Sequence, residues 1–289
     1  MANIAFLGTG LLGSALAEAA AKRGDTVSVW NRTPAKAEAL AQFGIRAAAT
    51  PAEAVQGASR VHLVLKDDAV VDEVIAAVGS GLTAGAIICD HTTTLPRLTA
   101  DRAWRLRAEG VNYLHCPVFM GPPAARNAQG SMMVSGPETL FIRVRDDLSR
   151  MTGRLEYLGE RADLGAVYKL CGNTLLIGVW STLADVLAVA TASEVRPTDA
   201  ISMLGLLDLN TVVRTRGVNM AQGNFAPNFE LDMARKDVGL MLDVLGDLPK
   251  AVLPSIAARM DELIAAGHGK ADAGVMAIDA VNTVSAKKT

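Results

Sequence analysis

Three glycines near the N-terminus, spaced as G-x-G-x-x-G, constrain this chain more than any other feature. They follow an apolar segment, residues 3–7, that predicts a strand, and they open a segment with helical periodicity, residues 11–23. In this setting Gly8 makes a tight turn, Gly10 lets the backbone approach a pyrophosphate, and Gly13 lets the helix pack closely on the strand. Phosphate binds well at such a helix N-terminus because free N–H groups point at it, although a turn without a ligand would show the same glycines. We predict a dinucleotide site at Gly8, Thr9, Gly10, Leu11, Leu12 and Gly13.

Strands and helices alternate through the first half of the chain. Apolar or β-branched runs predict the strands, and helical periodicity with end signals predicts the helices, such as Thr33 as N-cap with Pro34 after it, or Gly24 and Gly110 as closing residues. The strands are expected at residues 3–7, 26–30, 60–65, 86–89 and 111–114, and the helices at 11–23, 34–43, 68–78 and 98–109. This alternation with short connections predicts a parallel sheet with helices on both faces.

The second half of the chain changes character. Two more strand candidates, residues 132–135 and 155–158, precede an apolar helix predicted over 165–194, and shorter helices follow. A length of 289 residues suggests about two domains. We therefore expect an α/β domain over residues 1–161 and an all-helical domain over 162–289, joined by the long helix.

The composition excludes several classes of partner and site. Lys and Arg number 28 against 30 Asp and Glu, and the cations do not cluster as a nucleic-acid binder requires. Three scattered cysteines exclude a disulfide framework and fit a reducing cytoplasm. Four histidines lack metal-ligand spacing, so no metal site is expected.

Two apolar segments could be taken for membrane segments, and neither is expected to be one. The N-terminal segment lacks a basic leader and is interrupted by the glycine turn, so it is not a signal peptide. Residues 170–192 are long enough to span a bilayer, but Asn173 and Asp185 would be costly in lipid. We expect this helix to be buried on most faces, between domains or subunits, in a soluble cytoplasmic protein.

The end of the second predicted strand indicates the cofactor. An acidic residue there would bind the adenosine ribose hydroxyls, whereas this chain has Asn31, Arg32 and Thr33. A guanidinium binds a 2′-phosphate bidentately, so we predict NADP(H), with hydrogen bonds added by the two neighbours. A solvated arginine beside a threonine that only caps the next helix is the alternative. Leu65 and Lys66, at the end of the third predicted strand, are also assigned to the cofactor site.

Three further segments extend the pattern: D-H-T-T-T at residues 90–94, G-x-x-x-K-x-x-x-N at 165–173, and the pair Lys236-Asp237. With the glycine turn, and in this order, they resemble the β-hydroxyacid dehydrogenase family, which includes 3-hydroxyisobutyrate dehydrogenase and the NADP-binding domain of 6-phosphogluconate dehydrogenase. Imine reductases share this scaffold. The resemblance covers nearly the whole chain and implies a Rossmann-like domain, a long interdomain helix and an all-helical domain that dimerises. It also implies hydride transfer between nicotinamide and a small carbonyl or hydroxy compound.

The resemblance assigns roles to residues of these motifs. Lys169 and Asn173 are four apart and share a helix face. A lysine of lowered pKa donates the proton that a carbonyl oxygen needs after hydride transfer, while the asparagine orients the substrate or the lysine; a lysine that reaches solvent is the alternative. Thr93 is expected at the nicotinamide-side ribose, unless its segment is a simple turn. Lys236 is expected at the cofactor and substrate mouth, where Asp237 positions it or caps a helix, unless the two form an ordinary exposed ion pair.

One segment departs from the family. Where the family usually reads D-A-P-V-S-G-G and holds a substrate carboxylate, residues 115–123 read H-C-P-V-F-M-G-P-P. Phe119 and Met120 replace a serine and a glycine, and two prolines remove backbone donors, so a less polar substrate is expected. We assign the substrate site to Phe119, Met120, Gly121, Tyr168 and Trp180. Core packing is the alternative for the apolar residues, and Arg126 is expected either at the surface or on an acidic substrate.

Three functions fit these observations. The first is an NADPH-dependent carbonyl reductase or hydroxyacid dehydrogenase that works through Lys169. The second is an imine reductase, which the apolar segment favours but the lysine cation disfavours because it repels an iminium. The third is a non-catalytic binding module, which the retained lysine disfavours. The long helix, about 45 Å at 1.5 Å per residue, needs more cover than one domain provides, so a homodimer is expected.

Overall fold

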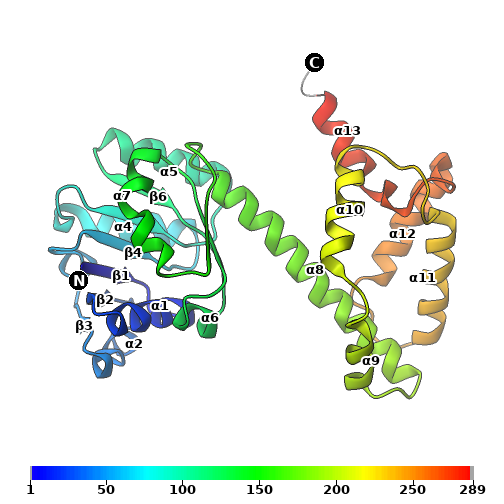
Figure 1. The fold of residues 1–289 in the computed structure, drawn as a ribbon, viewed down its shortest axis with the longest axis horizontal. Coiled ribbons are helices and arrows are strands. Elements are labelled where there is room, and N and C mark those ends of the chain that lie inside the picture. The colour runs from blue at the N-terminus through cyan, green and yellow to red at the C-terminus, as the bar shows by residue number, and fades with distance from the viewer. Residues whose placement is uncertain (1, 287–289) are drawn as a thin grey trace. The chain divides into compact units, whose positions relative to one another are not determined.

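A computed structural model describes residues 2–286 (Figure 1). The chain forms two compact units, Met1–Asn173 and Thr174–Thr289. The boundary between the units lies inside helix α8 (Leu164–Ala192). The sequence predicted a boundary before this helix, after residue 161. The first turns of α8 belong to the first unit because their backbone and side chains form hydrogen bonds with its strands and loops.

The first unit is built on a six-stranded parallel sheet with strand order β3-β2-β1-β4-β5-β6. Its strands are β1 (Asn3–Leu7), β2 (Thr26–Trp30), β3 (Arg46–Ala47), β4 (Arg60–Leu63), β5 (Ile87–Asp90) and β6 (Asn112–His115). The sequence predicted all but β3, whose two residues are too few to form a periodic pattern. The strand order reverses between β1 and β4, and such sheets bind ligands at this point, outside the carboxyl ends of the strands. The glycine turn lies there because it follows β1 directly.

Helices cover both faces of this sheet, which confirms the predicted α/β architecture (Figure 1). In β1, Ile4 and Phe6 pack into one hydrophobic cluster, and Ala5 and Leu7 pack into the other. Successive side chains of a strand point to opposite faces, so burial on both sides gives the apolar runs of a parallel sheet. The helices are α1 (Leu11–Lys22), α2 (Pro34–Glu38), α3 (Pro51–Ala54), α4 (Asp68–Val78) and α5 (Pro96–Ala108).

Helix ends agree with the sequence in part. Gly24 and Gly110 follow α1 and α5 with positive φ, as closing glycines do. The helix predicted over residues 34–43 is shorter, because α2 is followed by a separate 3₁₀ turn, Ala41–Phe43. Thr33 occupies the N-cap position of α2, but its side chain forms no capping hydrogen bond.

A second, three-stranded sheet completes the first unit. Its strands are β7 (Val118–Phe119), β8 (Ser131–Val134) and β9 (Arg154–Tyr157), with helices α6 (Pro122–Arg126) and α7 (Glu138–Ser149) between them. Strands β7 and β8 are antiparallel, and β8 and β9 are parallel. The sequence predicted only β8 and β9. Helix α7 was missed because it is mostly polar and buries only Val144 and Leu148.

The described part of the second unit is helical. Its helices after α8 are α9 (Pro197–Leu204), α10 (Leu209–Ala221), α11 (Leu231–Leu245), α12 (Leu253–Leu263) and α13 (Ile278–Ala286). Apolar side chains of α11 and α12, among them Leu231, Val238, Leu253 and Met260, form its core. The prediction of an all-helical second unit is therefore confirmed.

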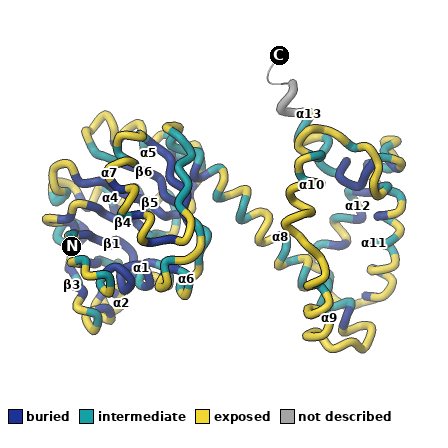
Figure 2. The backbone as a smooth tube through the Cα atoms, viewed as in Figure 1, coloured by how far each residue is buried: buried dark blue, intermediate teal, exposed yellow. Residues whose placement is uncertain are grey.

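Helix α8 is largely exposed within the single chain, so the expected burial on most faces stays a prediction that needs cover from a second subunit. In an 18-residue apolar stretch of α8 only 11% is buried, and Figure 2 shows most of the helix as exposed or intermediate. By length and apolarity alone α8 could cross a membrane, a test that core helices of soluble proteins also pass. Its buried Asp185 accepts hydrogen bonds from the N–H groups of Ala251, Val252 and Leu253, at 2.6, 2.9 and 3.0 Å. The acidic residue of α8 therefore anchors the chain at the start of α12.

Candidate cofactor and active site

Glycine stands at the three positions of the turn for different structural reasons. Gly8 has a φ of +102°, and a Cβ added there would lie 2.3 Å from the carbonyl oxygen of Val64. A Cβ on Gly13 would lie 2.0 Å from the carbonyl oxygen of Gly8, so both positions require glycine for the fold itself. A Cβ on Gly10 would meet nothing within 4 Å. The open space at Gly10 is therefore free for a ligand phosphate beside the N-terminus of α1, which fits a dinucleotide.

The side chain of Asn31 ties the glycine turn to the end of β2. Its Oδ1 accepts a hydrogen bond from the N–H of Thr9 over 3.0 Å, and its Nδ2 donates to the carbonyl oxygen of Thr33 over 3.0 Å. The N–H of Gly8 donates to the carbonyl oxygen of Trp30 over 2.8 Å. Both ends of the Asn31 amide bind backbone and shape the site, and the residue also lines the pocket, so its predicted contact with the cofactor stays a prediction.

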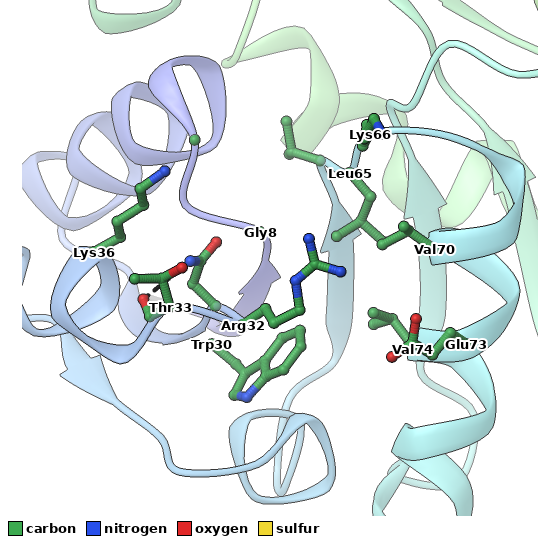
Figure 3. A pocket seen from close by; sticks show the side chains of 13 residues that line it. Gly8, Trp30, Arg32, Thr33, Lys36, Leu65, Lys66, Val70, Glu73 and Val74 are labelled. Atoms are coloured by element: carbon green, nitrogen blue, oxygen red, sulfur yellow. Dashed lines mark hydrogen bonds between the residues drawn. The ribbon is translucent and has the colours of Figure 1, made fainter.

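A pocket of about 320 Å³ opens at the carboxyl ends of β1, β2 and β4 (Figure 3). Its lining comprises Gly8, Gly10, Trp30, Asn31, Arg32, Thr33, Lys36, Val64, Leu65, Lys66, Val70, Glu73 and Val74. Figure 3 shows the guanidinium of Arg32 in the middle of this group, with Lys36 on one side and Val70 on the other. The sequence did not predict Lys36 or Trp30. Because α2 starts immediately after the end of β2, Lys36 in its first turn could have been placed at this edge.

The ends of β4 and β5 are joined by a chain of hydrogen bonds. The N–H of Leu65 donates to Thr92 Oγ1 over 3.1 Å, and the N–H of Thr92 donates to Asp90 Oδ1 over 2.9 Å. The other carboxylate oxygen of Asp90 accepts from the hydroxyl of Tyr113 over 2.8 Å. Thr92 is buried, whereas Thr93, the predicted ribose contact, is exposed and so is accessible to a ligand.

Lys169 is held by the short strand β7. Its Nζ donates a hydrogen bond to the carbonyl oxygen of Val118 over 2.7 Å and lies 4.2 Å from the ring centroid of Phe119. The side chain is half-buried, and this burial lowers the pKa of the ammonium. Asn173 follows one turn later on α8 and is also partly buried. The structure therefore places both predicted catalytic residues on the part of α8 that belongs to the first unit.

The other predicted substrate residues of the first unit lie in different settings. Met120 is partly buried against the hydrophobic cluster of the first unit, and Gly121 is the exposed N-cap of α6. Tyr168 is 49% exposed. Arg126 is exposed, which agrees with its expected place at the surface, and its Nε donates to the buried carboxylate of Glu18 over 2.8 Å and links α6 to α1.

Two predicted residues, Trp180 and Lys236, belong to the second unit. Trp180 is 63% exposed. Lys236 pairs with Asp237 over 2.8 Å, and both side chains are exposed. Asp237 lies inside α11 and does not cap it, which removes one of its two expected roles. The roles of the other two residues stay predictions.

The sheet order and the glycine turn match a known family. Residues 3–159 match the family model described as the NAD binding domain of 6-phosphogluconate dehydrogenase. The chain belongs to this family. It is therefore an oxidoreductase with a nicotinamide-cofactor-binding domain, and its resemblance to the β-hydroxyacid dehydrogenases is confirmed.

Individual relatives agree with this assignment. The chain is 30% identical to an uncharacterized oxidoreductase of Shewanella frigidimarina, over 84% of this chain and 85% of that protein. It is 26% identical to glyoxylate/succinic semialdehyde reductase 1 of Arabidopsis thaliana, over 89% of each chain. An imine reductase from Pseudomonas sp. has a similar structure, with a TM-score of 0.89 at 20% identity, over 95% of this chain and 98% of that one. At that identity the likeness shows a shared fold.

Proposed function

We propose that this oxidoreductase uses NADP(H) and transfers hydride between nicotinamide and a small carbonyl or hydroxy compound, with Lys169 as general acid and base. The proposal rests on the burial and the hydrogen bond of the Lys169 ammonium. This ammonium is half-buried and bound to a backbone carbonyl, and its pKa is lowered by burial. An ammonium of lowered pKa gives up its proton more readily near neutral pH than an exposed lysine does.

The proton transfer follows from this placement. Reduced nicotinamide, when bound, supplies the hydride. As the substrate oxygen gains negative charge, Lys169 Nζ donates a proton to it, and in the reverse direction the neutral amine takes the hydroxyl proton. Asn173 lies one turn further along the same face of α8. We assign its amide to orienting the substrate oxygen.

Arg32 and Lys36 support NADP(H) over NAD(H). Both line the pocket at the end of β2, the position where an acidic residue would bind ribose hydroxyls and repel a 2′-phosphate. With Lys66 they bring three cations to the lining, against one carboxylate there, that of Glu73. A guanidinium offers a 2′-phosphate two parallel hydrogen bonds.

Imine reduction is the second candidate because Phe119 places an apolar ring next to Lys169. The two functions are separated by initial rates of NADPH consumption with a panel of aldehydes, keto acids and cyclic imines. We expect turnover of an aldehyde or keto acid. Turnover of cyclic imines alone would favour the second candidate, and NADPH binding without any turnover would favour a non-catalytic binding module.

We also propose a cytoplasmic homodimer with no nucleic-acid or membrane partner. Large apolar side chains are exposed on four helices of the second unit. They include Leu175, Leu176, Ile177, Trp180, Ile201, Met203, Val212, Val213, Leu240, Met241 and Val244. Many exposed large apolar side chains on one unit are typical of a subunit interface. Three free cysteines support a reducing compartment.

A further inference from the structure

The ammonium of Lys169 lies over the face of an aromatic ring. Its Nζ is 4.2 Å from the ring centroid of Phe119 and donates a hydrogen bond to the carbonyl oxygen of the preceding residue, Val118. A cation at this distance is attracted by the negative face of the π-system. Both contacts come from β7, so a strand of two residues holds the ammonium.

Gly172 provides the space for this ring. It follows Lys169 by three residues on α8 and lies on the same face. A Cβ added to Gly172 would lie 2.2 Å from Cζ and 2.7 Å from Cε1 of Phe119, so the ring edge rests directly on helix backbone. A larger residue at position 172 would push the ring away from the ammonium.

The surroundings of the Lys169 ammonium are mostly uncharged. Burial is the cause of the lowered ammonium pKa. On α8 the adjacent titratable groups are Tyr168 and Cys171, and on β6 the buried imidazole of His115 stays neutral because burial lowers its pKa. In the segment before α8, Arg161 and Asp163 pair with each other. Within the described residues of this unit, the π face and the Val118 carbonyl are therefore the groups that stabilise the charged form.

We propose that Phe119 is a positioning residue that keeps the general acid charged and in place, and that Gly172 is required to hold its ring there. The inference rests on the proposed role of Lys169. An aromatic face attracts the ammonium less strongly than a carboxylate and accepts no proton. It therefore offsets part of the effect of burial without making the lysine a poor acid.

The direct test is a titration of Lys169 itself. The protein is labelled with ¹³C at lysine Cε, and the resonance is assigned by its loss in Lys169→Met. Phe119→Leu keeps an apolar side chain but removes the π face, so the titration midpoint should fall by about 0.5 to 1 pH unit. Phe119→Met, a second apolar variant without a π face, should lower the midpoint by a similar amount. An unchanged or higher midpoint in the leucine variant would overturn the proposal.

The same change should appear in kinetics. Because reduction needs the protonated amine, its rate falls above the pKa of Lys169. In Phe119→Leu and Phe119→Met this alkaline limb of the kcat profile should move to lower pH by the same amount as the titration midpoint. A lower rate at every pH with an unmoved limb would mean that the ring only fills space, and would contradict the inference.

Gly172→Ala tests the space for the ring, with Gly178→Ala on the same helix as the matched control. A Cβ at Gly178 meets nothing within 4 Å, so that variant should titrate like wild type. Gly172→Ala should lower the midpoint as Phe119→Leu does, and the double variant should fall no further, because both remove one contact. Additive effects would contradict the proposed coupling.

A failure of the positioning role of Phe119 can be distinguished from a failure of the catalytic role of Lys169. If the midpoint falls in Phe119→Leu but Lys169→Met keeps full carbonyl reductase activity, the positioning stands and the catalytic role of the lysine fails. If Lys169→Met is inactive but the midpoint does not move, the catalytic role stands and the positioning fails.

Discussion

The guanidinium of Arg32 enters the pocket at the end of β2, beside Lys36 (Figure 3). One bidentate phosphate contact contributes roughly 1.5 to 3 kcal/mol, or about tenfold to a hundredfold in binding. Arg32→Ala should therefore lower the ratio of kcat/KM for NADPH to that for NADH by this factor. Arg97→Ala is the control, since this exposed arginine pairs with Asp101 away from the pocket. An unchanged ratio in Arg32→Ala would remove this residue from cofactor selection.

Three buried histidines make the first unit sensitive to acid. Burial lowers the pKa of His62, His91 and His115, so each is neutral when folded and gains a proton on unfolding once the pH is below about 6.5. The free energy of unfolding should therefore fall as the pH drops from 7.5 to 5.5, by up to about 1.4 kcal/mol per histidine per pH unit. Paired carboxylates lose their contribution only below roughly pH 4.5.

Urea unfolding at pH 7.5 and at pH 5.5 measures the change in the free energy of unfolding. Hydrogen exchange of amides in β4 and β5 shows whether this change lies in the sheet. His268→Asn is the control, because this residue lies in the second unit and its loss should leave the difference between the two pH values intact. Equal stability of the sheet at pH 7.5 and 5.5 would contradict the account.

On helix α8, backbone N–H groups stabilise the buried carboxylate of Asp185. Its carboxylate accepts three backbone N–H groups at the start of α12, and these hydrogen bonds lower its pKa despite its burial. Asp185→Asn removes the charge and leaves donors unsatisfied, at a cost of about 1.5 to 3 kcal/mol in the unfolding free energy of the second unit. Asp199→Asn, an exposed partner of Arg196, should change it by less than about 0.5 kcal/mol. Equal effects of the two variants in calorimetry would contradict the anchoring role.

Elements with a strong periodic pattern could be predicted from the sequence, and short or polar ones could not. β1 and β2 and helix α4 agree with the prediction at both ends. β3 and β7 have two residues each, and their pairing depends on neighbours far away in the chain. The motifs placed Lys169 on a helix and Gly10 at the phosphate turn. The contact of Phe119 with Gly172 joins residues that are distant in sequence, and no local pattern encodes it.

The proposed homodimer rests on the surface of the second unit. Apolar side chains of α8 and of the next three helices are exposed in the single chain, and covering them favours association. We expect at least a dimer by sedimentation at micromolar concentration. Ile177→Glu places a charge on the exposed face of α8 and should shift the equilibrium towards monomer, whereas Thr191→Glu, at an exposed position in the last turn of the helix, should not. A wild-type monomer would contradict the proposal.

Lys169 is central to the proposed mechanism, and Lys169→Met tests its role most directly. Methionine keeps the unbranched stem and avoids a cavity. General acid catalysis contributes about 10²- to 10⁴-fold, so kcat for carbonyl reduction should fall by that factor while NADPH affinity stays unchanged, since the cofactor pocket is formed by other residues. Carbonyl reduction at the wild-type rate in this variant would contradict the proposed mechanism.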